Sequence, residues 1–253
     1  MKPLIKELFF QFVRIELPRN RASILMYHSV SDRPDYFWAV PRSDFASQMK
    51  YLSDAKKPVI ALAELVRRVR SGESLGGSVA LSFDDGYRDN YTNAFPVLKK
   101  YGFPATIFVT TDCMGKFDTH NLEHLSVGEM KEMEASGLID IEPHTKSHPR
   151  LARLSNDAAR EEIEGSRKRV ADILGKPAPL FAYPYGDFNA ETERIVKNSG
   201  FIAAATVREG TVSSESDPFQ LPRNSIDRST TLRQFRGKIS RAVDFYQALK
   251  LWE

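Results

Sequence analysis

Apolar residues along the chain gather in short runs that alternate with longer amphipathic segments. Short runs rich in β-branched and aromatic residues predict buried strands, whereas apolar positions three and four residues apart predict helices. Glycine follows several of the helical segments, as it often follows helix ends. The predicted strands are Ile24–Tyr27, Val79–Phe83, Ala105–Val109, Ile139–Glu142, Leu180–Tyr183 and Phe201–Thr206. The predicted helices are Asp44–Ala55, Leu62–Ser71, Asn90–Tyr101, Ser126–Ser136, Asp157–Leu174 and Ala190–Asn198.

This alternation is typical of repeated βα units built around a parallel sheet or barrel, so the fold class is α/β. The 253 residues, of which 42% are hydrophobic, are enough to bury one large core. No repeat or long linker divides the sequence. We therefore expect a single barrel domain over residues 23–253, preceded by a lead-in over residues 1–22. Residues 211–218 are expected to form an exposed loop.

The spacing of apolar residues in the lead-in, residues 1–22, predicts an amphipathic helix. Its charged residues interrupt the apolar core that a secretory signal needs, and no run in the chain approaches the length of a transmembrane helix. The helix is expected to dock on the barrel, with contact to a membrane surface as the alternative. A cytoplasmic location, or a peripheral one at the inner membrane face, follows as the expectation. The apolar stripe consists of Leu4, Ile5, Leu8, Phe9, Phe12 and Val13.

Composition narrows the chemistry. A formal net charge of +3, with both signs interspersed, favours neither nucleic acid nor a strongly acidic molecule as a partner. The single cysteine, Cys113, rules out an intrachain disulfide and a multi-cysteine zinc site. Any bound metal must therefore rely on histidine and carboxylate ligands.

Polar motifs directly follow four of the predicted strands. In a βα barrel the active site lies where strands end and βα loops begin, so these motifs are expected to meet at one edge. The motifs are Tyr-His at 27–28, Asp-Asp-Gly at 84–86, His-Thr-Lys-Ser-His at 144–148 and Tyr-Pro-Tyr-Gly at 183–186.

Two of these motifs together predict a metal site. His144 and His148 are four residues apart, a spacing that lets two imidazoles reach one ion. Asp84 and Asp85 sit on a tight turn, so one can bind the ion while the other stays free as a base. Two imidazoles and one carboxylate suit Zn²⁺ or another divalent transition ion and leave positions open for water and substrate. Asp84 is the candidate base.

The segments LSFDDGY, HTKSHP and FAYPYG, in this order and spacing, resemble the polysaccharide deacetylase family, carbohydrate esterase family 4. The resemblance covers roughly residues 24–223 and implies a distorted (β/α)7 barrel that hydrolyses N-acetyl groups on glycans. It implies Asp84 as the base, and Asp85, His144 and His148 as ligands of a divalent metal, with Zn favoured and Co or Ni as alternatives. The residue at Tyr185 would present its backbone N–H to a developing oxyanion, and the same resemblance assigns it that role.

The sequence departs from the common family pattern at two points. An arginine that orients the base heads the third motif in the family, but Ala182 stands there, so Arg223 and Arg88 are the substitute candidates. The common form also has a late histidine that protonates the leaving amine, and no histidine follows His148. His28 in its Tyr-His context resembles the acid of a permuted branch that includes poly-N-acetylglucosamine deacetylases. Histidine is well suited to donate a proton near neutral pH.

Other candidate residues lie in polar loops. His120 and His124 are expected to be solvated or to form a lip of a substrate groove, because no carboxylate motif accompanies them. Phe37 and Trp38 could stack on a sugar face or pack an edge of the barrel.

The predicted activity is metal-dependent hydrolysis of N-acetyl groups from an amino sugar or N-acetylated glycan, releasing acetate. Two alternatives stay open. One is a small, formamide or lipid-linked amide substrate, which the apparent lack of an export signal favours. The other is a glycan-binding derivative without activity, which the missing third-motif arginine suggests.

Overall fold

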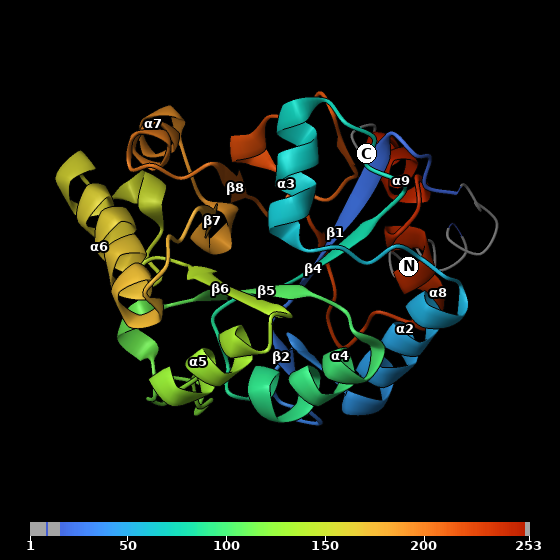
Figure 1. The fold of residues 1–253 in the computed structure, drawn as a ribbon, viewed down its shortest axis with the longest axis horizontal. Coiled ribbons are helices and arrows are strands. Elements are labelled where there is room, and N and C mark those ends of the chain that lie inside the picture. Colours follow the sequence, from blue (N-terminus) through green and yellow to red (C-terminus); the bar gives the residue numbers. More distant parts are fainter. Residues whose placement is uncertain (1–8, 10–15, 251–253) are drawn as a thin grey trace.

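The computed structural model describes residue 9 and residues 16–250. Its fold is α/β, with mostly parallel strands at the centre and helices around them (Figure 1). The central sheet runs in the order β10-β1-β4-β5-β6, and all four pairs along this path are parallel. These strands are β1 (Arg21–Tyr27), β4 (Val79–Phe83), β5 (Ala105–Val109), β6 (Ile139–Pro143) and β10 (Asn224–Ser225).

Shorter strands complete the sheet structure. β9 (Val212–Ser213) pairs antiparallel with β1, which makes the central sheet mixed. β7 (Leu180–Ala182) pairs with β8 (Ala203–Ala205), and β2 (Ser29–Val30) pairs with β3 (Ala39–Val40). Between β6 and β7 a side chain contributes to the contact, because the Leu180 N–H donates to a carboxylate oxygen of Glu142 at 3.0 Å.

Helices surround the strands, with α4 and α5 below the sheet in Figure 1, α3 above it, and α6 and α7 to its left. Glycine in a left-handed conformation ends α3, α4 and α6. Side-chain caps begin α5, α6, α7 and α8. The helices are α2 (Arg42–Asp54), α3 (Leu62–Ser71), α4 (Phe95–Tyr101), α5 (Val127–Ala135), α6 (Asn156–Leu174), α7 (Ala190–Asn198), α8 (Leu232–Lys238) and α9 (Ala242–Lys250).

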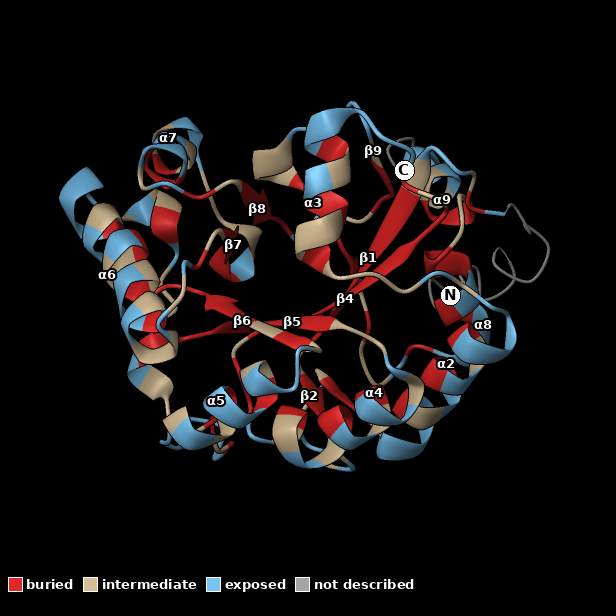
Figure 2. Ribbon diagram, in the orientation of Figure 1, coloured by how far each residue is buried: buried red, intermediate tan, exposed pale blue. Residues whose placement is uncertain are grey.

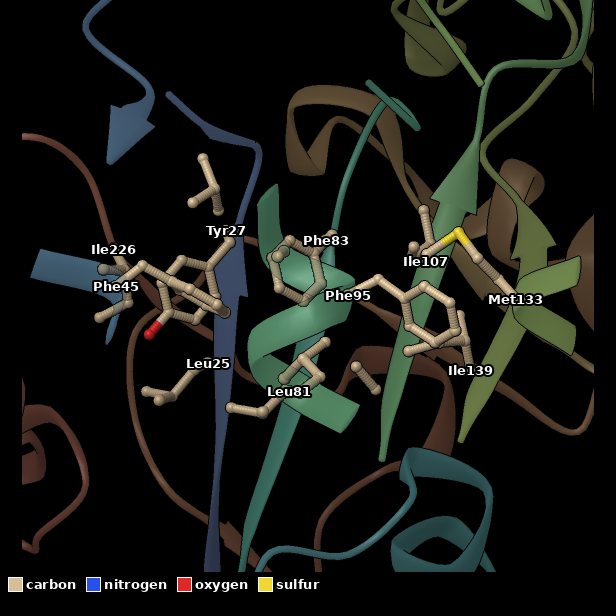
Figure 3. Close-up of a cluster of buried hydrophobic side chains, with 14 of the residues drawn as sticks. Leu25, Tyr27, Phe45, Leu81, Phe83, Phe95, Ile107, Met133, Ile139 and Ile226 are labelled. Atoms are coloured by element: carbon tan, nitrogen blue, oxygen red, sulfur yellow. The ribbon is translucent and has the colours of Figure 1, made fainter. Parts of the chain in front are cut away.

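The core lies between the strands and these helices. β4 and β5 are buried along their whole length, as expected of strands with both faces covered, and the outer helix faces are exposed (Figure 2). On one side of the sheet, the rings of Tyr27, Phe45 and Phe83 contact one another, with centroids 5.2–6.0 Å apart (Figure 3). This packing fixes the ends of β1 and β4, where the polar motifs begin.

The predicted strands and helices are present, with corrections at several points. The helix predicted over 90–101 begins instead as a π-helical turn, Asn90–Ala94, followed by α4. The exposed loop predicted over 211–218 is wrong at its start, because Thr211 and Val212 are buried and Val212 belongs to β9. β1 begins at Arg21, before the predicted start of this strand at Ile24.

The amphipathic helix predicted over residues 1–22 lies almost entirely outside the described residues. Phe9, the described residue of that stripe, has its ring 5.4 Å from the ring of Tyr246 in α9. No helix within residues 16–250 is long and apolar enough to cross a membrane.

Candidate metal centre

The four polar motifs meet because parallel strands carry their ends to the same edge. His28 follows β1, and Asp84 and Asp85 follow β4. His144 follows β6, and the turn containing Tyr185 follows β7. Gly86 completes the aspartate turn at φ +72°, where an added Cβ would lie 2.7 Å from a side-chain carbon of Val109. This position therefore requires glycine for both its conformation and its close approach to β5.

Asp85, His144 and His148 form a cluster that could hold a metal ion. One potential ligand atom from each lies within 4.8 Å of the other two. The Nε2 atoms of His148 and His144 are 3.3 and 3.8 Å from Oδ1 of Asp85. Ligand bonds of about 2.0–2.2 Å in tetrahedral geometry separate donor atoms by roughly 3.3 Å, so the cluster is close to the size that such an ion requires.

His144 is prepared to act as a neutral ligand. Its Nδ1 lies 2.7 Å from the carbonyl oxygen of Ala182, which fixes the proton on Nδ1 and leaves the lone pair on Nε2. Burial lowers the pKa of His144 to about 4, so the ring is neutral near pH 7. A neutral imidazole is the form that binds metal ions.

Three residues of the site adopt left-handed backbone conformations without being glycine. Asp85 has φ 70°, His148 has φ 61° and Tyr185 has φ 58°. Such conformations are uncommon for these residue types and persist only where surrounding contacts hold them. Their concentration at one edge of the sheet is typical of a functional site.

Asp84 forms a buried ion pair with Arg223. Two guanidinium nitrogens of Arg223 donate to the two carboxylate oxygens at 2.6 and 2.7 Å. The Arg223 side chain is 0% exposed and the Asp84 side chain 4%. Burial alone would raise the pKa of Asp84, but the charges of Arg223 and His144 more than offset it and hold that pKa well below its usual range. Asp84 is therefore ionised across the normal pH range.

The two arginines considered as substitutes for the third-motif arginine lie in different places. Arg223 is further fixed by a hydrogen bond from its Nε to the carbonyl oxygen of Thr206 at 2.9 Å. Arg88 is exposed, and it pairs instead with Glu123 and Glu129. The candidate assignment of Arg88 as the partner of Asp84 is therefore wrong.

His28 lies between β1 and β2, near enough to Asp84 for its charge to act on that carboxylate. Its ring packs against Trp38 with centroids 4.9 Å apart, and its carbonyl oxygen accepts a hydrogen bond from Asn90 at 2.7 Å. Its charge makes a smaller contribution to the lowered pKa of Asp84, behind burial, Arg223 and His144. The ring of Phe37 lies 5.2 Å from Trp38, and Phe37 is exposed.

Tyr185 lies beside the opposite part of the cluster. Its ring centroid is 4.5 Å from that of His148, and the guanidinium of Arg150 covers it at 4.4 Å. The side chain is 53% exposed. The site is thus bordered by aromatic rings at His28 and at His148.

The two loop histidines differ from each other. His120 is exposed as predicted, but His124 is buried, so its prediction as solvated is wrong. The Nδ1 of His124 lies 3.0 Å from the carbonyl oxygen of Asp85, and its ring packs against Tyr87. His124 therefore supports the aspartate turn from behind. The apolar neighbours Leu122 and Leu125, which are also buried, are the sequence signal that could have indicated the burial of His124.

An α/β fold that carries buried histidine and aspartate side chains at its strand ends defines the protein as a candidate metal-dependent hydrolase. A family model described as polysaccharide deacetylase matches residues 71–204. The candidate polysaccharide deacetylase YxkH of Bacillus subtilis (strain 168) is 34% identical over 216 residues, covering 84% of this chain and 73% of YxkH. The chain belongs to the polysaccharide deacetylase family and is a hydrolase of N-acetyl amide bonds.

Further relatives agree with this membership. The poly-β-1,6-N-acetyl-D-glucosamine N-deacetylase of Staphylococcus aureus (strain MSSA476) is 29% identical over 232 residues, covering 83% of this chain and 80% of that protein. The structure of IcaB from Ammonifex degensii superposes with a TM-score of 0.80 at 27% identity, over 87% of this chain and 97% of IcaB. The structure of the Streptococcus pyogenes deacetylase PplD in complex with acetate superposes with a TM-score of 0.79 at 26% identity, over 88% of this chain and 99% of PplD.

Replacing Arg223 by methionine should leave Asp84 as an unpaired buried charge. We expect Arg223→Met to lower the free energy of unfolding by about 3–5 kcal/mol at neutral pH. In the wild type the depressed pKa makes Asp84 stabilising above about pH 4, with the contribution lost on acidification. In the variant burial dominates and raises that pKa, so stability should fall as the pH rises above about 4.

Urea unfolding of both chelator-treated proteins between pH 4 and 7 measures this difference. The stability gap between them should widen as the pH rises. Arg88→Met, which removes an exposed arginine, is the matched control and should change the unfolding free energy little. A gap that narrows towards pH 7 would contradict the assignment of Arg223 as the counter-charge of Asp84.

Proposed function

We propose that the chain is a metal-dependent N-deacetylase of an N-acetylated glycan, releasing acetate and a free amine. The observation that carries this proposal is the meeting of an Asp85–His144–His148 cluster with the buried Asp84–Arg223 pair. A metal ion bound at such a site lowers the pKa of a water molecule and polarises a carbonyl. Zn²⁺ suits the two imidazoles and one carboxylate, and Co²⁺ or Ni²⁺ would also fit these ligands.

Asp84 is the proposed general base. Its carboxylate is ionised, and each oxygen retains a lone pair besides the one that accepts from Arg223. Oδ2 lies 4.0 Å from Nε2 of His144, and this proximity to a proposed ligand supports the role. Arg223 keeps this carboxylate in one orientation, so it can take the proton of the attacking water without first rearranging.

Tyr185 and His28 are proposed to act on the other atoms of the amide. The backbone N–H of Tyr185, on the turn after β7, would donate to the oxyanion that develops as water attacks. His28 would then protonate the nitrogen as the carbon–nitrogen bond breaks, so the amine leaves in neutral form. Packing against Trp38 holds the His28 ring for this transfer.

The substrate class is proposed from both the site and the relatives. The Staphylococcus aureus relative is named for poly-β-1,6-N-acetyl-D-glucosamine, and we propose a related N-acetylglucosamine polymer for this chain. The exposed rings of Phe37, which contacts Trp38, and of Tyr185, which contacts His148, could stack on sugar faces.

We also propose that the strands form a distorted (β/α)7 barrel. The seven strands would be β1, β4, β5, β6, β7, β8 and β10. The Glu142–Leu180 hydrogen bond between β6 and β7 and the parallel bridge of Ala205 with Leu221 support this arrangement. Both contacts lie where the regular strand pairing is interrupted.

Asp84→Asn tests the base. Removing the proton acceptor should lower the rate of acetate release from N-acetylglucosamine oligomers by about 10²–10⁴-fold. Because Asp85, His144 and His148 are untouched, the variant should still bind one equivalent of Zn²⁺, measured by calorimetry on chelator-stripped protein. Loss of Zn²⁺ binding in a folded variant would instead make Asp84 a ligand.

His28→Ala tests the acid through the leaving group. The variant should lose about 10²–10⁴-fold in the hydrolysis of an N-acetyl amide, because an unprotonated amine leaves poorly. It should lose much less on 4-nitrophenyl acetate, whose leaving group needs no proton. His120→Ala, at an exposed loop histidine, is the matched control and should retain both activities. An equal loss on both substrates would refute the acid role.

A further inference from the structure

The segment between the two histidines of the metal site has a strained backbone. Thr145 and His148 both have left-handed conformations, with φ of 67° and 61°. Neither is glycine, so the conformation of this segment must be maintained by contacts outside it. The direction of the His148 ring depends on that conformation, because His148 lies at the end of the segment.

The backbone of this segment is held from two sides. From the inner side, the N–H groups of Thr111 and Asp112, which follow β5, donate to the carbonyls of Thr145 and Lys146 at 3.1 and 2.8 Å. Within the segment, the His148 N–H donates to the Thr145 hydroxyl oxygen at 3.0 Å. The outer side is held by one residue of α6.

That residue is Glu162. One of its carboxylate oxygens accepts from the backbone N–H groups of Lys146 and Ser147 at 2.8 and 2.9 Å. Its other oxygen accepts from the Ser147 hydroxyl at 2.7 Å. Three hydrogen bonds to one ionised carboxylate are stronger than three neutral ones and fix their donors tightly. Glu162 lies within the 19-residue helix α6, which makes it a firm support.

We propose that Glu162 is a positioning residue for metal binding: by holding the 145–148 segment from α6, it sets the orientation of His148 toward Asp85. This inference rests on the proposed function of the Asp85–His144–His148 cluster. The neighbouring Glu161 provides a contrast: it is exposed, and among the described residues its carboxylate pairs only with the side-chain amine of Lys146, at 2.7 Å. Glu161 therefore has the same charge and nearly the same place but no hold on the backbone.

The test is the affinity of the chelator-stripped full chain for Zn²⁺, measured by competition with a chelating dye. Glu162→Leu removes all three acceptor contacts and should weaken Zn²⁺ binding roughly 10-fold or more, the range seen when groups that orient metal ligands are lost. Glu162→Gln keeps one acceptor oxygen and should fall between Glu162→Leu and the wild type. Glu161→Leu and Glu161→Gln should bind like the wild type.

Activity at saturating Zn²⁺ supplies the second measurement. A residue that acts only through His148 predicts that excess Zn²⁺ restores most of the turnover rate of Glu162→Leu. Urea unfolding of the stripped proteins shows whether the substitution also destabilises the fold. The loss of Zn²⁺ affinity should be larger than any loss of folding stability in the same variant would explain. If Glu162→Leu does not fold, Glu162→Gln against Glu161→Gln makes the same comparison.

Wild-type affinity in both Glu162 variants, or equal weakening in the matched Glu161 variants, would overturn the inference while leaving the proposed metal site intact. Failure of the wild type to bind one equivalent of Zn²⁺ would overturn the metal site, and this inference would fall with it.

Discussion

The buried pair of Asp84 and Arg223 is the interaction on which the site depends. It joins the end of β4 to the start of β10 across 139 positions of sequence, and neither side chain has appreciable contact with water. Removing a carboxylate from water is costly, and the bidentate contact with a guanidinium offsets that cost only in good geometry. The pair therefore fixes the relative positions of two strand ends while it keeps the carboxylate ionised. The proposed role of Asp84 as a general base requires both properties.

Around this pair the structure stores backbone strain at residues of the candidate metal site. Asp85, His148 and Tyr185 each adopt a conformation that their residue types disfavour. Contacts from neighbouring elements hold the first two: His124 contacts the Asp85 carbonyl, and residues after β5 together with α6 hold the segment that leads to His148. Rigid elements thus determine the directions of side chains that themselves lie on loops.

The strands, most of the helices and the meeting of the four motifs could be predicted from the sequence, because they follow from local apolar periodicity and from the geometry of parallel strands. Arg223 could be named from the sequence as a candidate partner of Asp84, but only the fold shows that Arg223, and not the nearby Arg88, reaches that carboxylate. The burial of His124 depends on the fold in the same way, because Tyr87 and the Asp85 turn, which cover it, lie far from it in the sequence.

The strand β9 and the contact of Glu162 could not be predicted from the sequence either. β9 has only two residues, Val212 and Ser213, and its burial comes from pairing with β1 rather than from any pattern of its own. The contact of Glu162 with the 145–148 segment spans 15 and 16 residues and involves backbone N–H groups, which carry no sequence signal.

The central claim is that acetate release from an N-acetylated glycan requires a divalent ion held by Asp85, His144 and His148. Its most direct test is acetate production from N-acetylglucosamine oligomers by chelator-stripped protein, before and after one equivalent of Zn²⁺, Co²⁺ or Ni²⁺ is restored. The account predicts no release from the stripped protein and recovery on adding metal, with acetate and free amine formed in equal amounts. Release that is undiminished in fully stripped protein, or none with any metal or oligomer, would contradict it.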